Sequence, residues 1–153
     1  MLKELPEENS NIEEDGLEKT LSESGLCITA IHGVSMEPML DQKTDRVIIE
    51  KITGRLLPGD VALYRRGDSY VLHRVIEVLP GGYLIRGDNC IGTEKVSDPQ
   101  VIGRLCAVQR NGSLIEVTDA LNRKYMEKAK ATLWIRKGKA GIFRLIKKVL
   151  FYV

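Results

Sequence analysis

The amino-acid sequence predicts a mainly β protein, in which an antiparallel sheet is followed by helices at the carboxyl end. Two observations predict the sheet. Short runs rich in Val, Ile, Leu and Tyr follow one another without helical segments between them, and turn signals such as Asn111-Gly112 separate these runs. Closely spaced strands of this kind pair with their neighbours as hairpins. A third observation predicts the helices, because after Thr118 the apolar residues recur at helical spacing.

The 153 residues are enough for one domain with its own core. We divide the chain into an acidic, partly disordered lead-in over residues 1–24, a β-domain over 25–118 and a basic helical tail over 119–153. Residues 12–24 of the lead-in can form a short helix. The predicted strands of the β-domain cover residues 25–31, 46–52, 60–64, 69–79, 81–87, 100–110 and 113–118.

The tail is predicted to form two helices. Leu121, Tyr125, Ala129 and Leu133 share one helical stripe. The segment Lys-Gly-Lys-Ala-Gly at 137–141 is expected to end this helix, and a second amphipathic helix is expected over residues 142–153.

The two ends of the chain carry opposite charge. Residues 1–25 contain eight acidic residues and two lysines, a net charge of −6, whereas residues 121–153 contain ten Lys and Arg and one Glu, a net charge of +9. A basic amphipathic helix can lie on an anionic membrane surface. The apolar stripe could equally cover the β-domain, and the sequence leaves both readings open.

Cysteine and histidine counts argue against a disulfide framework, a metal site or a bound cofactor. The three cysteines form no C-x-x-C pair, and the chain has only two histidines. The amino terminus shows neither the basic nor the apolar region of a signal peptide, and no run of about 18 apolar residues occurs. We therefore expect a cytoplasmic protein, with peripheral attachment at the inner face of the membrane as a hypothesis.

The segment GVSMEPML at residues 33–40 contains the first candidate functional residue, Ser35. Its hydroxyl could cap a helix or stabilise a turn, and these structural roles are the commoner ones for a serine near a proline. It could also be a nucleophile if a base can take its proton. His73, in the predicted strand 69–79, is the candidate base. Asp88, in the turn-like segment RGDNC, could orient the imidazole, and Asp98 is the alternative.

Taken in order, the segments GVSMEPML, LPGDVALYRR, YVLHRVIEV, GYLIRGDN and VIGRL resemble the type I signal peptidase superfamily, which also includes the self-cleaving LexA-like proteins. The resemblance covers roughly residues 26–110. Ser35-Met36-x-Pro38 is similar to the nucleophile motif of this superfamily. His73-Arg74-Val75 stands where bacterial signal peptidases carry Lys-Arg-Val and resembles the Ser-His branch.

The resemblance implies a serine endopeptidase that cleaves leader or signal-like peptide segments by a Ser-His mechanism. Ser35 would be the nucleophile, His73 the general base and Asp88 the residue that orients it, with Asp98 as the alternative. Backbone around Gly33, Ser35 and Met36 would stabilise the oxyanion and contact the substrate.

This chain departs from the superfamily at two places. Many signal peptidases carry a hydroxyl two residues before the nucleophile, where this sequence has Gly33, and a membrane anchor, where this sequence has the acidic lead-in. It is most similar to the small bacterial signal-peptidase-like proteins without that anchor. The alternative function is a non-catalytic module that binds a peptide or partner through the same fold. Nucleic acid is disfavoured as a partner because no helix-turn-helix precedes the motifs, and the oligomeric state stays open.

Overall fold

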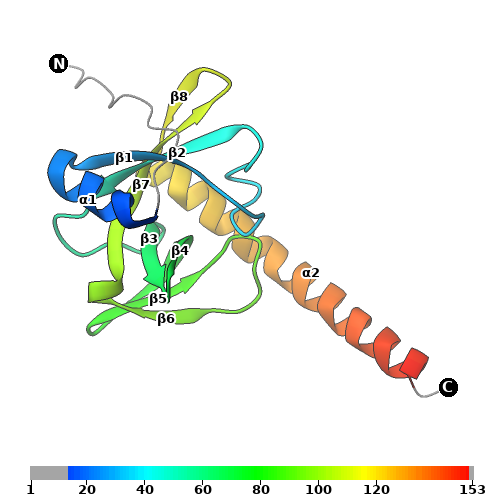
Figure 1. Ribbon diagram of the computed structural model, residues 1–153. Coiled ribbons are helices and arrows are strands. Elements are labelled where there is room, and N and C mark those ends of the chain that lie inside the picture. The colour runs from blue at the N-terminus through cyan, green and yellow to red at the C-terminus, as the bar shows by residue number, and fades with distance from the viewer. Residues whose placement is uncertain (1–13, 152–153) are drawn as a thin grey trace.

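The computed structural model describes residues 14–151, which form one curled antiparallel sheet preceded by a short helix and followed by a long one (Figure 1). The helices are α1 (Glu14–Ser24) and α2 (Asp119–Phe151), and a 3₁₀ turn, η1 (Asp98–Gln100), precedes β7. The strands are β1 (Leu26–Ala30), β2 (Asp45–Lys51), β3 (Val61–Arg66), β4 (Ser69–Leu79), β5 (Gly82–Arg86), β6 (Glu94–Ser97), β7 (Val101–Arg110) and β8 (Ser113–Glu116). Their order in space is β1-β2-β7-β3-β4-β5-β6, with β8 paired to β7. The predicted mainly β, antiparallel fold is confirmed.

Two short turns set the register of the hairpins. Gly67 and Asp68 join β3 to β4, so that residue 66 pairs with residue 69 and Ala62 lies opposite His73. Asn111 and Gly112 join β7 to β8 with positive φ angles of 50° and 77°, as a two-residue hairpin turn of type I′ requires. Both connections agree with the turn signals of the sequence.

One strand was not predicted. β6 has four residues, of which only Val96 is buried, and polar or small residues surround it. It forms because its backbone pairs with β5, with Ile85 opposite Glu94. So short a run carries too little apolar periodicity to be recognised in isolation.

The side chains on the two faces of the sheet form two separate apolar clusters. Because side chains alternate along a strand, His73 and Arg74 of β4 point to opposite faces. On the face of the sheet to which His73 points, the cluster contains Tyr64, Val75, Tyr83 and Ile85. The face of Arg74 belongs to a cluster of Val61, Leu63, Leu105 and others, against which α1 and the first turns of α2 pack.

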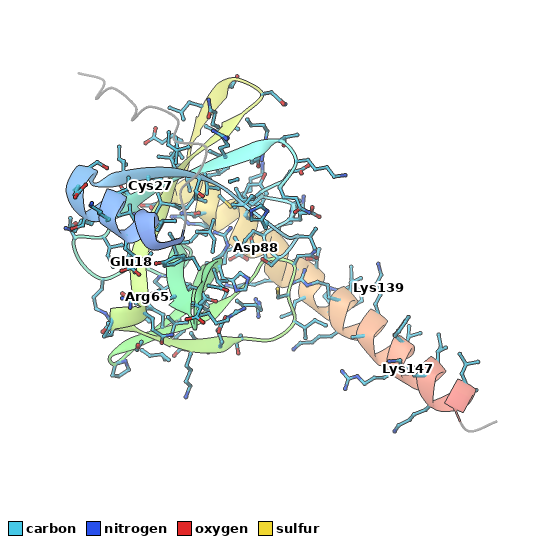
Figure 2. The ribbon with its side chains drawn as sticks, viewed as in Figure 1. Glu18, Cys27, Arg65, Asp88, Lys139 and Lys147 are labelled. Carbon is cyan, nitrogen blue, oxygen red and sulfur yellow. The ribbon has the colours of Figure 1, made fainter. Side chains whose placement is uncertain are left out.

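The short helix predicted near the amino terminus is present as α1. Leu17 and Leu21 are buried against the sheet, and Glu18 forms an ion pair with Arg65 of β3 at 2.9 Å (Figure 2). This part of the predicted lead-in is therefore folded. The disorder expected for the first residues concerns positions 1–13, which lie outside the described residues.

The prediction of two helices in the tail is wrong, because α2 runs without a break from Asp119 to Phe151. The side chain of Thr118 caps its start by accepting a hydrogen bond from the Leu121 N–H at 3.1 Å. Gly138 and Gly141 each disfavour helix by about 1 kcal/mol, but no proline interrupts the segment, and the Lys, Ala and Leu residues around them are good helix formers.

Only the first turns of α2 belong to the β-domain. Asn122 and Ala129 are buried, and Leu121 and Tyr125 pack against the core. Beyond these turns the helix extends away from the sheet (Figure 1), and Lys139 and Lys147 mark this distal part in Figure 2. Within residues 14–151, no helix combines the length and the apolar character that crossing a bilayer requires.

Candidate active site

Ser35 lies on a tight turn between β1 and β2. The Met36 carbonyl accepts a hydrogen bond from the Leu40 N–H at 3.0 Å, and the side chains of Met36, Met39 and Leu40 are buried in the core. These anchors leave Ser35 half-buried at the surface. Its hydroxyl makes no hydrogen bond with the described residues, so the helix-capping role that the sequence left open is not the one observed.

The backbone around Ser35 offers two free donors. The N–H groups of Ser35 and Met36 donate no hydrogen bond to the part of the chain that the structure describes. The Gly33 N–H, by contrast, donates to Oε1 of Gln42 at 2.9 Å. Gly33 has a φ of +88°, a conformation that favours glycine, so the backbone at this position disfavours the hydroxyl residue of many signal peptidases.

His73 lies on β4 with its ring almost fully buried. Its Nδ1 lies 3.2 Å from the hydroxyl of Tyr64 and 3.8 Å from Oε1 of Glu94. Its Nε2 faces Gly87: a Cβ placed on this glycine would lie 3.0 Å from the nitrogen and 2.8 Å from the carbonyl oxygen of Ser35. The absence of a side chain at residue 87 therefore lets the imidazole and the Ser35 turn approach each other.

Asn89 joins the loop after β5 to the Ser35 turn. Its N–H donates to the Ser35 carbonyl at 2.8 Å, and its side-chain amide donates to the Val34 carbonyl at 3.1 Å. The candidate nucleophile and the loop that contains Asp88 are thus held together by backbone and side-chain hydrogen bonds.

Asp88 is not placed where the sequence analysis expected it. Both of its carboxylate oxygens accept hydrogen bonds from Arg74, each at 2.7 Å, and this ion pair is almost fully buried. Arg74 points to the opposite face of β4 from His73, so its partner, the Asp88 carboxylate, lies on that opposite face as well. Its closest contacts make Asp88 a residue that positions the loop, and no direct hydrogen bond to the imidazole is present among the described residues.

Asp98 does not contact His73 either. It lies in η1, half-exposed, and accepts a hydrogen bond from Arg55 at 2.9 Å. The same guanidinium donates to the Leu79 and Gly82 carbonyls, which places Asp98 at the far end of β4. Six residues of strand, roughly 20 Å, separate that end from His73.

The partners of His73 are instead Tyr64, Glu94 and, through them, Arg66. The Tyr64 hydroxyl donates a hydrogen bond to Oε1 of Glu94, and Arg66 donates to both groups. A phenol has one proton, and here it is directed to a carboxylate, which can only accept. We therefore assign the Tyr64 oxygen as the acceptor from His73, which places the imidazole proton on Nδ1 and leaves Nε2 with its lone pair.

The surroundings keep His73 neutral. Burial, followed by the positive charge of Arg66, lowers the pKa of His73 below its ordinary value of 6.5, while Glu94 and Asp88 oppose this shift. Burial and the bond to Glu94 raise the pKa of Tyr64, so the phenol keeps its proton. Burial alone would raise the pKa of Glu94, but the hydrogen bonds from Arg66 and Tyr64 outweigh it and keep this carboxyl ionised.

The sequence analysis missed Tyr64 and Glu94, although one of them left a signal. The Gly67-Asp68 turn places Ala62 opposite His73, and Tyr64 is then its diagonal neighbour on the same face. Glu94 left no such signal, because it reaches the site through the pairing of β6 with β5, and nothing local in the sequence sets that register.

A second potential nucleophile lies beside His73. The thiol of Cys90 would be 2.7 Å from a Cβ on Gly87, the same point that Nε2 approaches. Burial raises the pKa of the Cys90 thiol, which disfavours the reactive thiolate. As for metals, no three His, Cys, Asp or Glu side chains within residues 14–151 gather where they could hold an ion.

Comparison with protein-family models and with curated proteins gives no match for this chain.

Proposed function

We propose that the protein is a serine endopeptidase in which Ser35 is the nucleophile and His73 the general base. The observation that supports this most strongly is the set of contacts around the imidazole, from which its state is inferred. A neutral ring, protonated on Nδ1 by its bond to Tyr64, presents a basic Nε2 towards the turn that carries Ser35. By the resemblance described above, the substrate would be an extended peptide segment of the leader or signal type.

The proposed reaction begins when Nε2 of His73 takes the Ser35 proton and Oγ attacks the scissile carbonyl. The free N–H groups of Ser35 and Met36 adjoin the nucleophile in the chain and are the donors that we expect to stabilise the resulting oxyanion. The C–N bond then breaks, and His73 returns the proton to the leaving amine. Water, deprotonated by His73, releases the acyl group from Ser35.

Tyr64 and Glu94 act as positioning residues in this scheme. Glu94 fixes the direction of the Tyr64 proton, and the Tyr64 oxygen fixes the tautomer of His73. In this scheme they orient the His73 imidazole, the role that the resemblance assigns to Asp88. Nitrogen-15 NMR of His73 at neutral pH is expected to show a proton on Nδ1 in the native chain and a mixture of tautomers in Tyr64→Phe. A proton on Nε2 in the native chain would contradict this assignment.

The experiment that tests the proposed activity is cleavage of a diverse peptide mixture, read by mass spectrometry. Native protein should produce cuts that vanish in Ser35→Ala and fall by about 10²–10⁴-fold in His73→Ala, the usual contribution of a general base. Cys90→Ala separates the two nucleophiles. The Cys90→Ala variant should still cut the peptides. Loss of cleavage in Cys90→Ala together with retained cleavage in Ser35→Ala would overturn the role of Ser35.

One observation favours a binding module as the second candidate function. The Ser35 hydroxyl is not hydrogen-bonded to His73, although catalytic hydrogen bonds often form only when substrate is bound. A binding module would retain peptides without cutting them, and Ser35→Ala would leave retention unchanged. Peptide capture without any cleavage by the native chain would favour this second function.

We also propose that α2 attaches the protein to an anionic membrane surface. Residues 131–150 contain six Lys and Arg and no acidic residue, and Trp134, Phe143 and Leu150 expose 71%, 67% and 70% of their surface. Apolar side chains of this exposure, interleaved with cations, suit the boundary between headgroups and acyl chains of anionic lipid.

Vesicle sedimentation tests this attachment. The protein should sediment with phosphatidylglycerol vesicles at low salt, less at high salt, and not with phosphatidylcholine. Replacing Lys139 and Lys147 by Gln should weaken binding by roughly 30-fold, from about 1 kcal/mol per charge. A matched variant that replaces the exposed Lys43 and Lys95 should bind like the native chain. Equal weakening in both variants, or no sedimentation at low salt, would contradict the proposal.

A further inference from the structure

Asn89, in the loop between β5 and β6, binds two successive carbonyl groups of the turn that carries Ser35. Its backbone N–H donates to the Ser35 carbonyl at 2.8 Å, and its side-chain Nδ2 donates to the Val34 carbonyl at 3.1 Å. A carbonyl oxygen can only accept hydrogen bonds, so the amide must present its NH₂ group to Val34. One residue thus holds the carbonyl of the candidate nucleophile and the carbonyl just before it.

Each of these carbonyls shares a peptide plane with one of the two free donors. Because the peptide bond is planar and trans, a carbonyl and the N–H of the following residue point in opposite directions. The Val34 carbonyl is therefore opposite the Ser35 N–H, and the Ser35 carbonyl is opposite the Met36 N–H. Neither of these N–H groups donates a hydrogen bond to the described part of the chain. By fixing the two carbonyls, Asn89 directs both free N–H groups away from itself.

His73 approaches Ser35 from the carbonyl side. Its Nε2 and the Ser35 carbonyl oxygen lie 3.0 Å and 2.8 Å from the same point, the position that a Cβ on Gly87 would occupy. The Met36 N–H is directed away from that carbonyl. The base and this donor are therefore on different sides of Ser35. Acyl transfer uses this arrangement, because the base takes the proton from Oγ while the donors meet the oxygen of the carbonyl under attack.

We propose that Asn89 is a positioning residue that orients the Ser35 and Met36 N–H groups towards the oxyanion of the peptidase reaction. This inference rests on the proposed function and extends it. Donors that are already oriented need not reorganise when charge develops on the substrate oxygen. Asn89 itself touches no reacting atom in this scheme and acts through the two peptide planes.

Gln42 offers a matched comparison on the same turn. Like Asn89 it is exposed, and its side-chain amide makes one hydrogen bond to the backbone, accepting from the Gly33 N–H at 2.9 Å. That bond holds the peptide plane before Gly33, which contains neither free donor. A role that consists only of tethering the turn would make the two amides equivalent, whereas the proposed role belongs to Asn89 alone.

Steady-state cleavage of one peptide by Asn89→Ala, Gln42→Ala and the native chain tests the proposal. Asn89→Ala should lower kcat by about 10–10²-fold, less than the roughly 10²–10³-fold cost of losing a donor outright, because the N–H of residue 89 still holds the Ser35 carbonyl. KM should stay unchanged, because the oriented donors act on the transition state. Gln42→Ala should keep the native kcat. Both variants should unfold at similar temperatures, because both side chains are exposed.

Nitrogen-15 relaxation of the Ser35 amide gives a readout that does not depend on cleavage. The order parameter should be near the rigid value of about 0.85 in the native chain and in Gln42→Ala, and should fall below about 0.6 in Asn89→Ala. An unchanged order parameter in Asn89→Ala would overturn the proposal.

The kinetic outcomes separate this inference from the proposed function. Native kcat in Asn89→Ala, a change in KM with kcat unchanged, or an equal loss of kcat in Gln42→Ala would overturn the role of Asn89 while leaving Ser35 and His73 as the proposed catalytic pair. Absence of cleavage by the native chain would overturn the proposed function, and this inference would fall with it.

Discussion

Gly87 has a larger effect on the candidate active site than its size suggests. The point where its Cβ would stand is within 3.0 Å of three groups: the Ser35 carbonyl, Nε2 of His73 and the Cys90 thiol. The carbonyl belongs to backbone that Asn89 holds in place, so it cannot easily move. The glycine is therefore required by close approach, and its φ is not among the positive values that would require it for conformational reasons.

Gly87→Ala is expected to separate the Ser35 turn from His73 and to reduce peptide cleavage by at least about tenfold, the cost of roughly 1.4 kcal/mol in the barrier. Gly92→Ala is the matched control, because a Cβ there meets nothing within 4 Å. Cleavage rates and thermal unfolding of both variants would be measured. Full activity in Gly87→Ala would show that the two residues do not need this approach.

The pH dependence of cleavage follows from the charges around His73. Only the neutral imidazole can accept the Ser35 proton, so activity should fall as the pH drops through the lowered pKa of His73, with a midpoint below 6.5. Glu94 raises this pKa and Arg66 lowers it. In rate profiles, Glu94→Gln should move the acidic limb to lower pH and Arg66→Gln to higher pH. Shifts of the same sign in both variants would contradict this electrostatic picture.

At the scale of elements, Arg74 of β4 contacts four other parts of the fold. Besides Asp88, its guanidinium donates to the Gly59 carbonyl at 2.7 Å and to the side chain of Asn122 at 3.1 Å, and it contacts the sulfur of Met39. β4, the loop after β5, the turn before β3, the start of α2 and the turn between β1 and β2 thus meet at one buried ion pair.

Asp88→Asn leaves Arg74 without its charged partner, and the free energy of unfolding should fall by about 3–5 kcal/mol, as for other buried pairs that lose one member. Urea denaturation would measure this change. Glu127→Gln, which breaks an exposed pair with Lys130, should change stability by less than about 1 kcal/mol. A similarly small effect in Asp88→Asn would show that the pair is not a structural junction.

The elements themselves divide into those that the sequence could predict and those that it could not. The seven strands with apolar alternation and their hairpin turns depend on local signals, and so were predicted. The Ser35 carbonyl and Nε2 of His73 both lie close to Gly87, but their proposed roles stay a prediction. The partner of Asp88, the short β6 and the place of Glu94 depend on contacts between distant segments, which no local pattern specifies. Gly138 and Gly141 predict a break in the tail, whereas the helix formers around them keep α2 continuous.

Continuity of α2 can be tested at Gly138. This glycine has an ordinary backbone conformation, and a Cβ there meets nothing, so Gly138→Ala should strengthen the helix by about 1 kcal/mol. Hydrogen exchange of residues 131–150 should slow accordingly, while Gly138→Pro should accelerate it. If the helix ended near residue 137, neither substitution would change exchange in this segment.

For the whole molecule, the candidate active site and the proposed attachment surface lie on different parts of the chain. The candidate active site belongs to the curled sheet, whereas the exposed cations and apolar side chains belong to the distal part of α2 (Figure 1). Arg136 lies at the junction, close enough to Arg86 and Cys90 to perturb the pKa of each. A protein attached through α2 would therefore hold its site near the surface to which it binds.

If Ser35 attacks the peptide carbonyl with His73 as its base, as we propose, an acyl group forms on Ser35 during turnover, and locating that group is the most direct test. The peptide that is cut fastest would be mixed with the protein, quenched in acid and mapped by mass spectrometry. We expect the amino-terminal part of the peptide as an ester on Ser35, absent in Ser35→Ala and in His73→Ala. An acyl group on Cys90, or steady cleavage with no acylated protein, would contradict the account.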